Sequence, residues 1–258
     1  MNIIHEYFKW RLNLLGYPSE DVQYRLSWCQ GDGMAFYGRI EEEYLIDFAW
    51  RFLRGRERQM AISAIEEKGW SISIDCCDHH YSHFNTMVVE ADCGDALSET
   101  EETAFNALFD CIRDDVVYVS KTLEKEGYAI VEAYVNEEGK VLRKWCTPAL
   151  TVRCKLVRDP FEEEADFYIG EKNVYAMKFM RDVIAGQYKL GGLVVEIVDN
   201  GTDEVIGEHT CGGISITWPA NKGTRALFRE VAAQAFYEAR PIWREIKSGR
   251  EAQIQQAA

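Results

Sequence analysis

The sequence lacks any apolar run long enough to cross a bilayer. Its longest runs, such as Gly191–Val195, fall far short of the roughly 20 residues that a spanning helix needs. The first ten residues lack a basic segment followed by an apolar stretch, so no secretory signal is expected. None of the eight cysteines forms a Cys-x-x-Cys pair. We therefore expect a cytoplasmic protein with no membrane contact, whose cysteines are mostly reduced and buried as small hydrophobic residues.

Motifs that carry catalysis are also missing. There is no Gly-x-Ser-x-Gly segment, no glycine-rich phosphate loop after an expected strand, and no cysteine in a recognisable reactive context. We predict no catalytic residue and no cofactor, and the sequence favours a protein that is not an enzyme.

The charge is distributed unevenly along the chain. Residues 1–140 contain 13 basic and 27 acidic side chains, whereas residues 141–258 contain 16 of each, so the first part carries the whole net charge of −14. Hydrophobic residues make up 47% of the chain, which excludes general disorder. A surface this acidic repels phosphate backbones and attracts basic protein surfaces, so we expect no direct nucleic-acid binding.

The clearest helix is predicted to start at Ser98 or Thr100, as alternative capping residues, and to stop at Gly127. Its apolar stripe runs from Phe105 to Leu123 with the i, i+3, i+4 and i+7 spacing of a helix face. The opposite face is acidic and forms a rigid surface. We predict partner binding through five residues of this helix: Glu99, Glu102, Asp110, Asp114 and Asp115.

The remaining pattern consists of hairpins alternating with helices. Helices are expected over residues 3–15, 42–66 with an interruption at Gly55, 174–184, and 224–246 with a kink at Pro241. Strands are expected over residues 24–29, 35–40, 70–76, 84–91, 141–146, 150–157, 193–198, 204–207 and 209–217. This order predicts an α+β fold with antiparallel hairpins.

The chain is long enough for one large domain or two smaller ones. We found no repeat of residues between its halves. Because the charge changes near residue 138, we predict an acidic α+β domain over residues 1–138 and a charge-balanced α+β domain over residues 139–250 that ends in a basic helix. Residues 251–258 are predicted to be a frayed tail.

One segment gathers residue types that bind metals. Residues 75–83 contain three of the five histidines, two cysteines and two aspartates. Thiolate, imidazole and carboxylate groups are zinc ligands, so we consider a zinc site formed by Asp75, Cys76, His79, His80 and His83. The alternative is a polar hairpin with packed histidines, because neighbouring cysteines of an extended segment point to opposite faces and no second ligand pair is evident.

A second segment of interest is the turn Gln30, Gly31, Asp32 and Gly33. Glycine supplies the positive φ that a tight hairpin turn needs, which favours a structural role. Asp32 between two glycines is alternatively a general base or a metal ligand. The segment lacks the glycine spacing and the following basic residue of a phosphate-binding loop.

The same turn lies in a segment with the pattern Ser-x-x-Gln-Gly-Asp-Gly-x-x-Phe-x-Gly, from Ser27 to Gly38. This segment, together with Tyr81–Met87, resembles accessory proteins of phages and prophages, over about 20 of the 258 residues. That family has no assigned activity, so the resemblance implies no catalytic residues. It implies expression inside a bacterium, in a protein of the kind that often blocks host defence.

Charge and resemblance together lead to one hypothesis of function. The chain is a phage-encoded inhibitor of bacterial immunity, of the anti-CRISPR or antirestriction type, located in the cytoplasm of the bacterial host. It binds stoichiometrically to a bacterial protein or ribonucleoprotein with a basic surface. Two alternatives stay open: an interaction or assembly protein, including a homodimer that joins the acidic helix to the basic C-terminal helix, and a metal-dependent enzyme that uses the cluster at residues 75–83.

Overall fold

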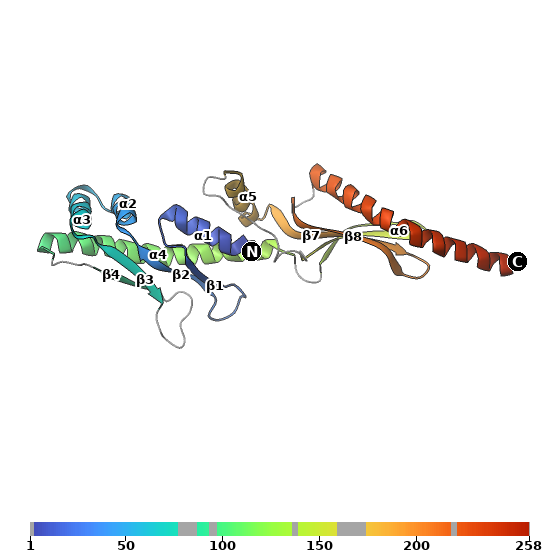
Figure 1. Ribbon diagram of the computed structural model, residues 1–258, viewed down its shortest axis with the longest axis horizontal. Coiled ribbons are helices and arrows are strands. Elements are labelled where there is room, and N and C mark those ends of the chain that lie inside the picture. Colours follow the sequence, from blue (N-terminus) through green and yellow to red (C-terminus); the bar gives the residue numbers. More distant parts are fainter. Residues whose placement is uncertain are drawn as a thin grey trace. The chain divides into compact units, whose positions relative to one another are not determined.

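The computed structural model describes residues 3–76, 87–92, 97–135, 139–158, 174–217 and 221–257, without the side chains of Cys76, Val174 and residues 251–257. Over these residues the chain forms six helices and two four-stranded antiparallel sheets, which confirms the α+β fold (Figure 1). None of the described helices combines the length and the apolarity needed to cross a membrane.

The chain divides into two compact units. The N-terminal unit comprises mainly residues 2–131 and the C-terminal unit mainly residues 132–258, with helix α5 (Val174–Ile184) divided between them. The division therefore falls after Val131, a few residues before the boundary expected from the charge.

The N-terminal unit consists of α1 (Ile3–Leu15), β1 (Asp21–Arg25), β2 (Gly33–Ile40), α2 (Glu42–Phe52), α3 (Gly55–Lys68), β3 (Ser71–Cys76), β4 (Met87–Asp92) and α4 (Glu99–Ala133). Its strands pair in the order β1-β2-β3-β4, with Val22 opposite Phe36 and Ile72 opposite Ala91. Figure 1 shows α4 running the length of this unit, past the sheet and the three shorter helices. The interruption expected at Gly55 is present between α2 and α3.

The C-terminal unit consists of β5 (Lys140–Cys146), β6 (Leu150–Val157), most of α5, β7 (Tyr188–Asp199), β8 (Glu204–Thr217) and α6 (Lys222–Ala257). Its strands pair in the order β5-β6-β7-β8. Each unit thus has a four-stranded meander, helical residues between the second and third strands, and a long helix after the fourth. The two units therefore share this order of strands and helices, although their sequences show no repeat.

The apolar stripe of α4 forms the centre of the N-terminal core. Phe105, Leu108, Ile112, Val116, Val119 and Leu123 are all buried, as their spacing predicted. Phe105 meets Trp70 edge to face, with ring centroids 4.4 Å apart, and the Ser120 hydroxyl donates to the Met34 carbonyl of β2. Each large apolar side chain buried here contributes about 1.5–3 kcal/mol to stability.

The prediction that this helix stops at Gly127 is wrong, because α4 continues to Ala133. Gly127 instead marks a close approach of α4 to α1. A Cβ atom at this position would lie 2.7 Å from both Leu26 Cδ1 and Phe8 Cζ. The residue is a glycine because neighbouring side chains occupy the space where a Cβ atom would stand.

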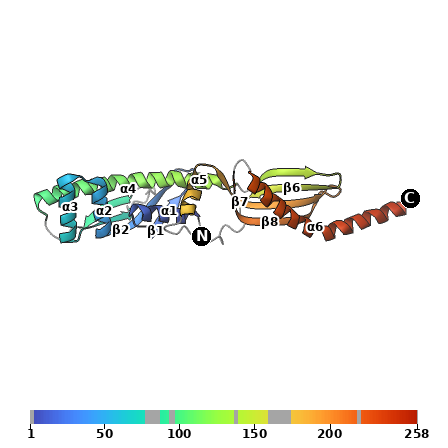
Figure 2. The same cartoon turned by 90° about the horizontal axis from the view of Figure 1, so that it is seen from above.

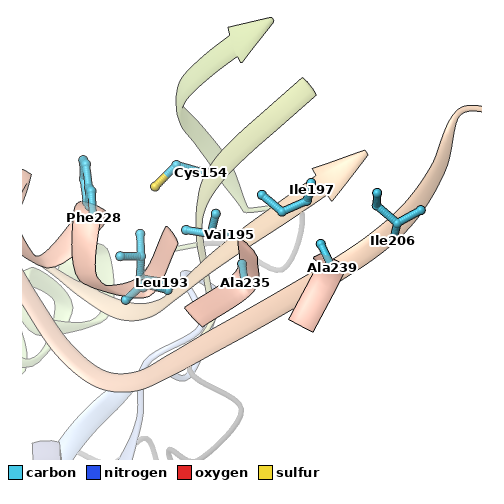
Figure 3. Packing of buried hydrophobic residues seen from close by; sticks show 9 residues of the cluster. Cys154, Leu193, Val195, Ile197, Ile206, Phe228, Ala235 and Ala239 are labelled. Atoms are coloured by element: carbon cyan, nitrogen blue, oxygen red, sulfur yellow. The ribbon is translucent and has the colours of Figure 1, made fainter. Parts of the chain in front are cut away.

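The core of the C-terminal unit lies between α6 and one face of the sheet (Figure 3). Every second residue of the middle of β7 faces this helix, as expected for a strand with period two. The cluster consists of Cys154, Leu193, Val195, Ile197, Ile206, Phe228, Val231, Ala235 and Ala239. Burial raises the pKa of the Cys154 thiol to about 11, so this cysteine acts as a hydrophobic residue.

The five cysteines whose side chains are described are all free, but only Cys154 is buried, while Cys29 and Cys146 are exposed. The expectation that most cysteines are buried is therefore wrong for this set.

Strand β8 is continuous, whereas the sequence predicted two strands that separate near Gly207. Helix α6 crosses the sheet at this glycine. A Cβ atom at Gly207 would lie 2.6 Å from the Cβ atom of Ala239. Gly207 therefore permits close packing of a helix on a strand and does not end the strand.

Helix α6 contains Pro241, and Figure 2 shows its axis changing direction part-way along its length, as expected for an internal proline. The helix then continues through Ala257, where a frayed tail was predicted. The guanidinium of Arg250 pairs with the carboxylate of Asp199, which is fully buried, and Thr202 donates to the same oxygen over 3.0 Å. This contact holds the last turns of α6 at the β7–β8 turn.

Candidate functional site

Helix α4 begins with a capping box. The Ser98 hydroxyl donates to the Glu101 carboxylate over 2.6 Å, and the Ser98 amide donates to the same oxygen over 2.7 Å. Lys68 of α3 lies 3.1 Å from this carboxylate. The bonds from Ser98, with help from Lys68, lower the pKa of Glu101 from 4.5 to about 2. Of the two predicted capping residues, Ser98 is the one that caps, and Glu101 holds the start of the helix.

Four of the five predicted partner-binding residues are exposed on α4: Glu99, Glu102, Asp110 and Asp114. Their separations of three, eight and four residues put them on one side of the helix. Arg113 lies 3.0 Å from the Asp110 carboxylate and 3.9 Å from that of Asp114, and all three side chains are more than half exposed. Such exposed pairs contribute little to stability and leave the carboxylates accessible. We call these four residues the acidic row.

The fifth predicted residue, Asp115, has a different environment. Its side chain is 12% exposed and lies 3.0 Å from the Arg51 guanidinium of α2. It also accepts a hydrogen bond from the Tyr17 hydroxyl over 2.7 Å. Burial and this hydrogen bond raise the pKa of the Tyr17 phenol well above its usual range. Asp115 therefore joins α4 to α2 and to the segment after α1, and it is not offered to a partner.

The exposed side of α4 changes character beyond the acidic row. Val117 and Tyr118 are 40% and 67% exposed, and Lys121 and Lys125 follow on the same side. The surface is thus acidic over its first four turns, apolar at Val117 and Tyr118 and basic at Lys121 and Lys125. The exposed Tyr118 was not singled out from the sequence, because its neighbours Val116 and Val119 belong to the buried stripe.

The turn Gln30–Gly33 connects β1 and β2, as predicted, and Gly31 has the positive φ of 92° that favours glycine. The Asp32 carboxylate accepts hydrogen bonds from the amides of Ser27 and Cys29, over 2.8 and 2.9 Å, and from the Cys29 thiol over 2.9 Å. Burial opposes ionisation, but these bonds and one from the Tyr128 hydroxyl hold the pKa of Asp32 below its usual value. The geometry supports the structural interpretation of this turn.

Two aromatic residues that the sequence did not connect meet at this turn. Trp28, in the left-handed conformation with φ of 58°, stacks on Tyr128 of α4 with ring centroids 3.9 Å apart. Trp28 is nevertheless 68% exposed. The roughly 100 residues between the two rings explain why no local pattern indicated the contact.

The candidate metal site lies mostly outside the described residues, which include neither His79, His80 nor His83. Asp75 is exposed at the end of β3, and Cys76 pairs with Met87 through the backbone. Within the described ranges, no group of three or more histidine, cysteine, aspartate or glutamate residues is arranged to hold a metal. The zinc hypothesis stays a prediction.

A pocket of about 390 Å³ lies between the end of α1 and helix α2. Helix α1 ends at Leu15, and the positive φ of 80° at Gly16 turns the chain so that the Tyr17 amide bonds the Leu12 carbonyl over 3.0 Å. Asp47 and Arg51 of α2 both line the pocket, so it contains one acidic and one basic side chain. No sequence pattern had indicated this pocket.

Comparisons with protein-family models, with curated proteins and with solved structures find no match to this chain.

Proposed function

We propose that this protein acts by stoichiometric binding, with the acidic row of α4 occupying a basic surface of a partner protein. The observation that carries the proposal is the exposure of Glu99, Glu102, Asp110 and Asp114 along one side of a continuous helix of 35 residues. Carboxylates arranged in this way are complementary to arginine and lysine side chains, and such complementarity raises association rates and selects partners.

The rigidity of α4 supports the proposal. Asp115 ties the helix to Arg51 and Tyr17, the capping box fixes its start, and Gly127 packs against Phe8. A surface that is ordered before binding loses little conformational entropy when the complex forms.

The partner class follows from the charge and from the phage resemblance. Nucleic-acid-binding grooves are lined with cationic side chains that neutralise phosphates. A row of carboxylates competes for the same side chains. The proposed partner is therefore a bacterial immune nuclease or its ribonucleoprotein, and the protein is an inhibitor of the anti-CRISPR or antirestriction type acting in the bacterial cytoplasm.

The test is a titration of purified CRISPR effector complexes and restriction enzymes with this protein, with target-DNA binding as the readout. For the true partner we expect DNA binding to fall to zero near one protein per effector. Unchanged DNA binding and cleavage across the effectors would contradict the proposal.

The matched variants carry the same change of charge. The row variant E99Q/E102Q/D110N/D114N removes four carboxylates from α4. The control variant E20Q/E42Q/E43Q/E66Q removes four exposed carboxylates elsewhere in the N-terminal unit. Only the row variant should lose inhibition. Equal loss in both would show that net charge is responsible and not the acidic row.

A further inference from the structure

The exposed side of α6 carries a row of arginines interleaved with an aromatic residue. Arg225, Arg229, Phe236, Arg240 and Arg244 are all exposed and follow one another at intervals of four, seven, four and four residues. These intervals keep side chains on one side of a helix. We call these five residues the basic row.

The four guanidinium groups of this row make no ion pair within the part of the chain that the structure describes, in contrast to Arg11, Arg51, Arg153 and Arg250. Arginine is suited to bidentate bonds with carboxylates, and it is enriched with aromatic residues at protein interfaces. Tyr237, which is 71% exposed, widens the apolar part of this surface. The basic row therefore has the composition of a docking surface for an acidic protein.

The chain itself supplies a surface with the complementary charges. The acidic row on α4 is followed by the exposed Val117 and Tyr118, just as Phe236 and Tyr237 follow Arg225 and Arg229 on α6. The acidic row is opposite in charge to the arginines of the basic row, and exposed apolar residues adjoin both rows.

We propose that the basic row of one copy binds the acidic row of a second copy. A nucleic acid is a less suitable occupant, because the net charge of −14 repels phosphates at long range. The proposal rests on the proposed function in one respect. Self-association covers the acidic row, so a basic partner must displace the second copy, and the association regulates access to the inhibitory surface.

The experiment uses two charge-reversed forms of the full chain. The first, R225E/R229E/R240E/R244E, makes the row on α6 acidic, and the second, E99K/E102K/D110K/D114K, makes the row on α4 basic. Each form then carries two rows of the same sign. A control form, R143E/K144E/K178E/R181E, reverses four exposed bases on β5 and α5. Circular dichroism establishes that each form is folded.

Sedimentation velocity measures the association at about 0.05 M and at about 0.5 M salt. Higher salt weakens a contact made by exposed charges, because the Debye length falls from about 10 Å at 0.1 M to about 3 Å at 1 M. We expect the natural chain and the control to associate at low salt and to dissociate at high salt. Each reversed form alone should be monomeric. Their equimolar mixture should associate, because the basic row on α4 of one form meets the acidic row on α6 of the other.

Three outcomes overturn the proposal: a monomeric natural chain at low salt over all concentrations tested, self-association of either reversed form, or a mixture that stays monomeric. A fourth result overturns it in favour of a nucleic-acid site. In that result the natural chain stays monomeric and binds a labelled single-stranded RNA, and the form reversed on α6 does not bind the RNA. The form reversed on α6 should keep inhibiting the partner. If the form reversed on α4 also inhibits, the proposed function fails while the association result stands.

Discussion

The phenol of Tyr17 donates a hydrogen bond of 2.7 Å to the carboxylate of Asp115, which joins the segment after α1 to the long helix α4. The side chain of the preceding residue, Asp114, is 82% exposed, whereas that of Asp115 is 12% exposed. Two neighbouring acidic residues therefore have different roles: one contributes to the surface and the other holds the fold.

This difference predicts opposite outcomes for two neighbouring substitutions. Asp115→Ala should lower the free energy of unfolding by about 1–3 kcal/mol, because Tyr17 and Arg51 lose a half-buried acceptor. Asp114→Ala should change it by less than about 0.5 kcal/mol. Urea denaturation followed by circular dichroism measures both. Equal destabilisation would contradict the assignment of Asp115 to the interior network.

Gly127 and Gly249 provide a second matched pair, because both lie within long helices. Alanine is favoured over glycine in a helix interior by about 1 kcal/mol. No atom lies within 4 Å of the position that a Cβ atom would take at Gly249, so Gly249→Ala should stabilise the protein. Gly127→Ala should destabilise it by about 1–3 kcal/mol, because the new Cβ atom would overlap Phe8 and Leu26. Thermal unfolding tests both predictions, because the melting temperature should rise in Gly249→Ala and fall in Gly127→Ala.

The Asp32 network predicts local protection of the first hairpin. Asp32→Ala removes the acceptor for the amides of Ser27 and Cys29, so peptides that cover residues 26–33 should exchange their amide hydrogens faster. Tyr128→Phe removes one donor and should have a smaller effect in the same direction. Hydrogen exchange measured by mass spectrometry tests this. Unchanged exchange in Asp32→Ala would show that the backbone holds the turn without the carboxylate.

Glu101 predicts a specific dependence of stability on pH. Its pKa is lowered in the folded protein, so its contribution is fully present above the unfolded value of 4.5 and is lost as the pH falls towards about 2. The natural chain should therefore lose more stability between pH 6 and pH 3 than Glu101→Gln does. Glu102→Gln, in which an exposed carboxylate is removed, should follow the natural chain. Urea midpoints at the two pH values measure the loss of stability of each protein. Identical losses in all three proteins would contradict the capping role.

Local patterns in the sequence were sufficient for most of the elements. The stripe from Phe105 to Leu123, the capping pair Ser98 and Glu101 and the interruption at Gly55 depend on residues close together in the chain, and the structure contains all of them. Helix α5 has the predicted bounds, because its apolar spacing is self-contained.

The features that the sequence did not indicate depend on contacts between distant residues. Gly127 resembles a helix stop until Phe8 is known to lie against it, and Gly207 resembles a strand end until Ala239 is known to cross it. Asp114 and Asp115 are neighbouring residues of the same type, so the sequence alone does not separate their roles. Only the positions of Tyr17 and Arg51 in the structure distinguish them. Each of these assignments requires the tertiary structure.

The central claim is that the acidic row captures a basic nucleic-acid-binding surface. The most direct measurement is the dissociation constant between this protein and an effector that it inhibits, compared for the natural chain, the row variant E99Q/E102Q/D110N/D114N and the control variant E20Q/E42Q/E43Q/E66Q. The row variant should bind about 100-fold more weakly, since four exposed charge pairs at about 0.7 kcal/mol each correspond to that factor. The control should bind like the natural chain. A row variant that binds as tightly as the control would contradict the claim.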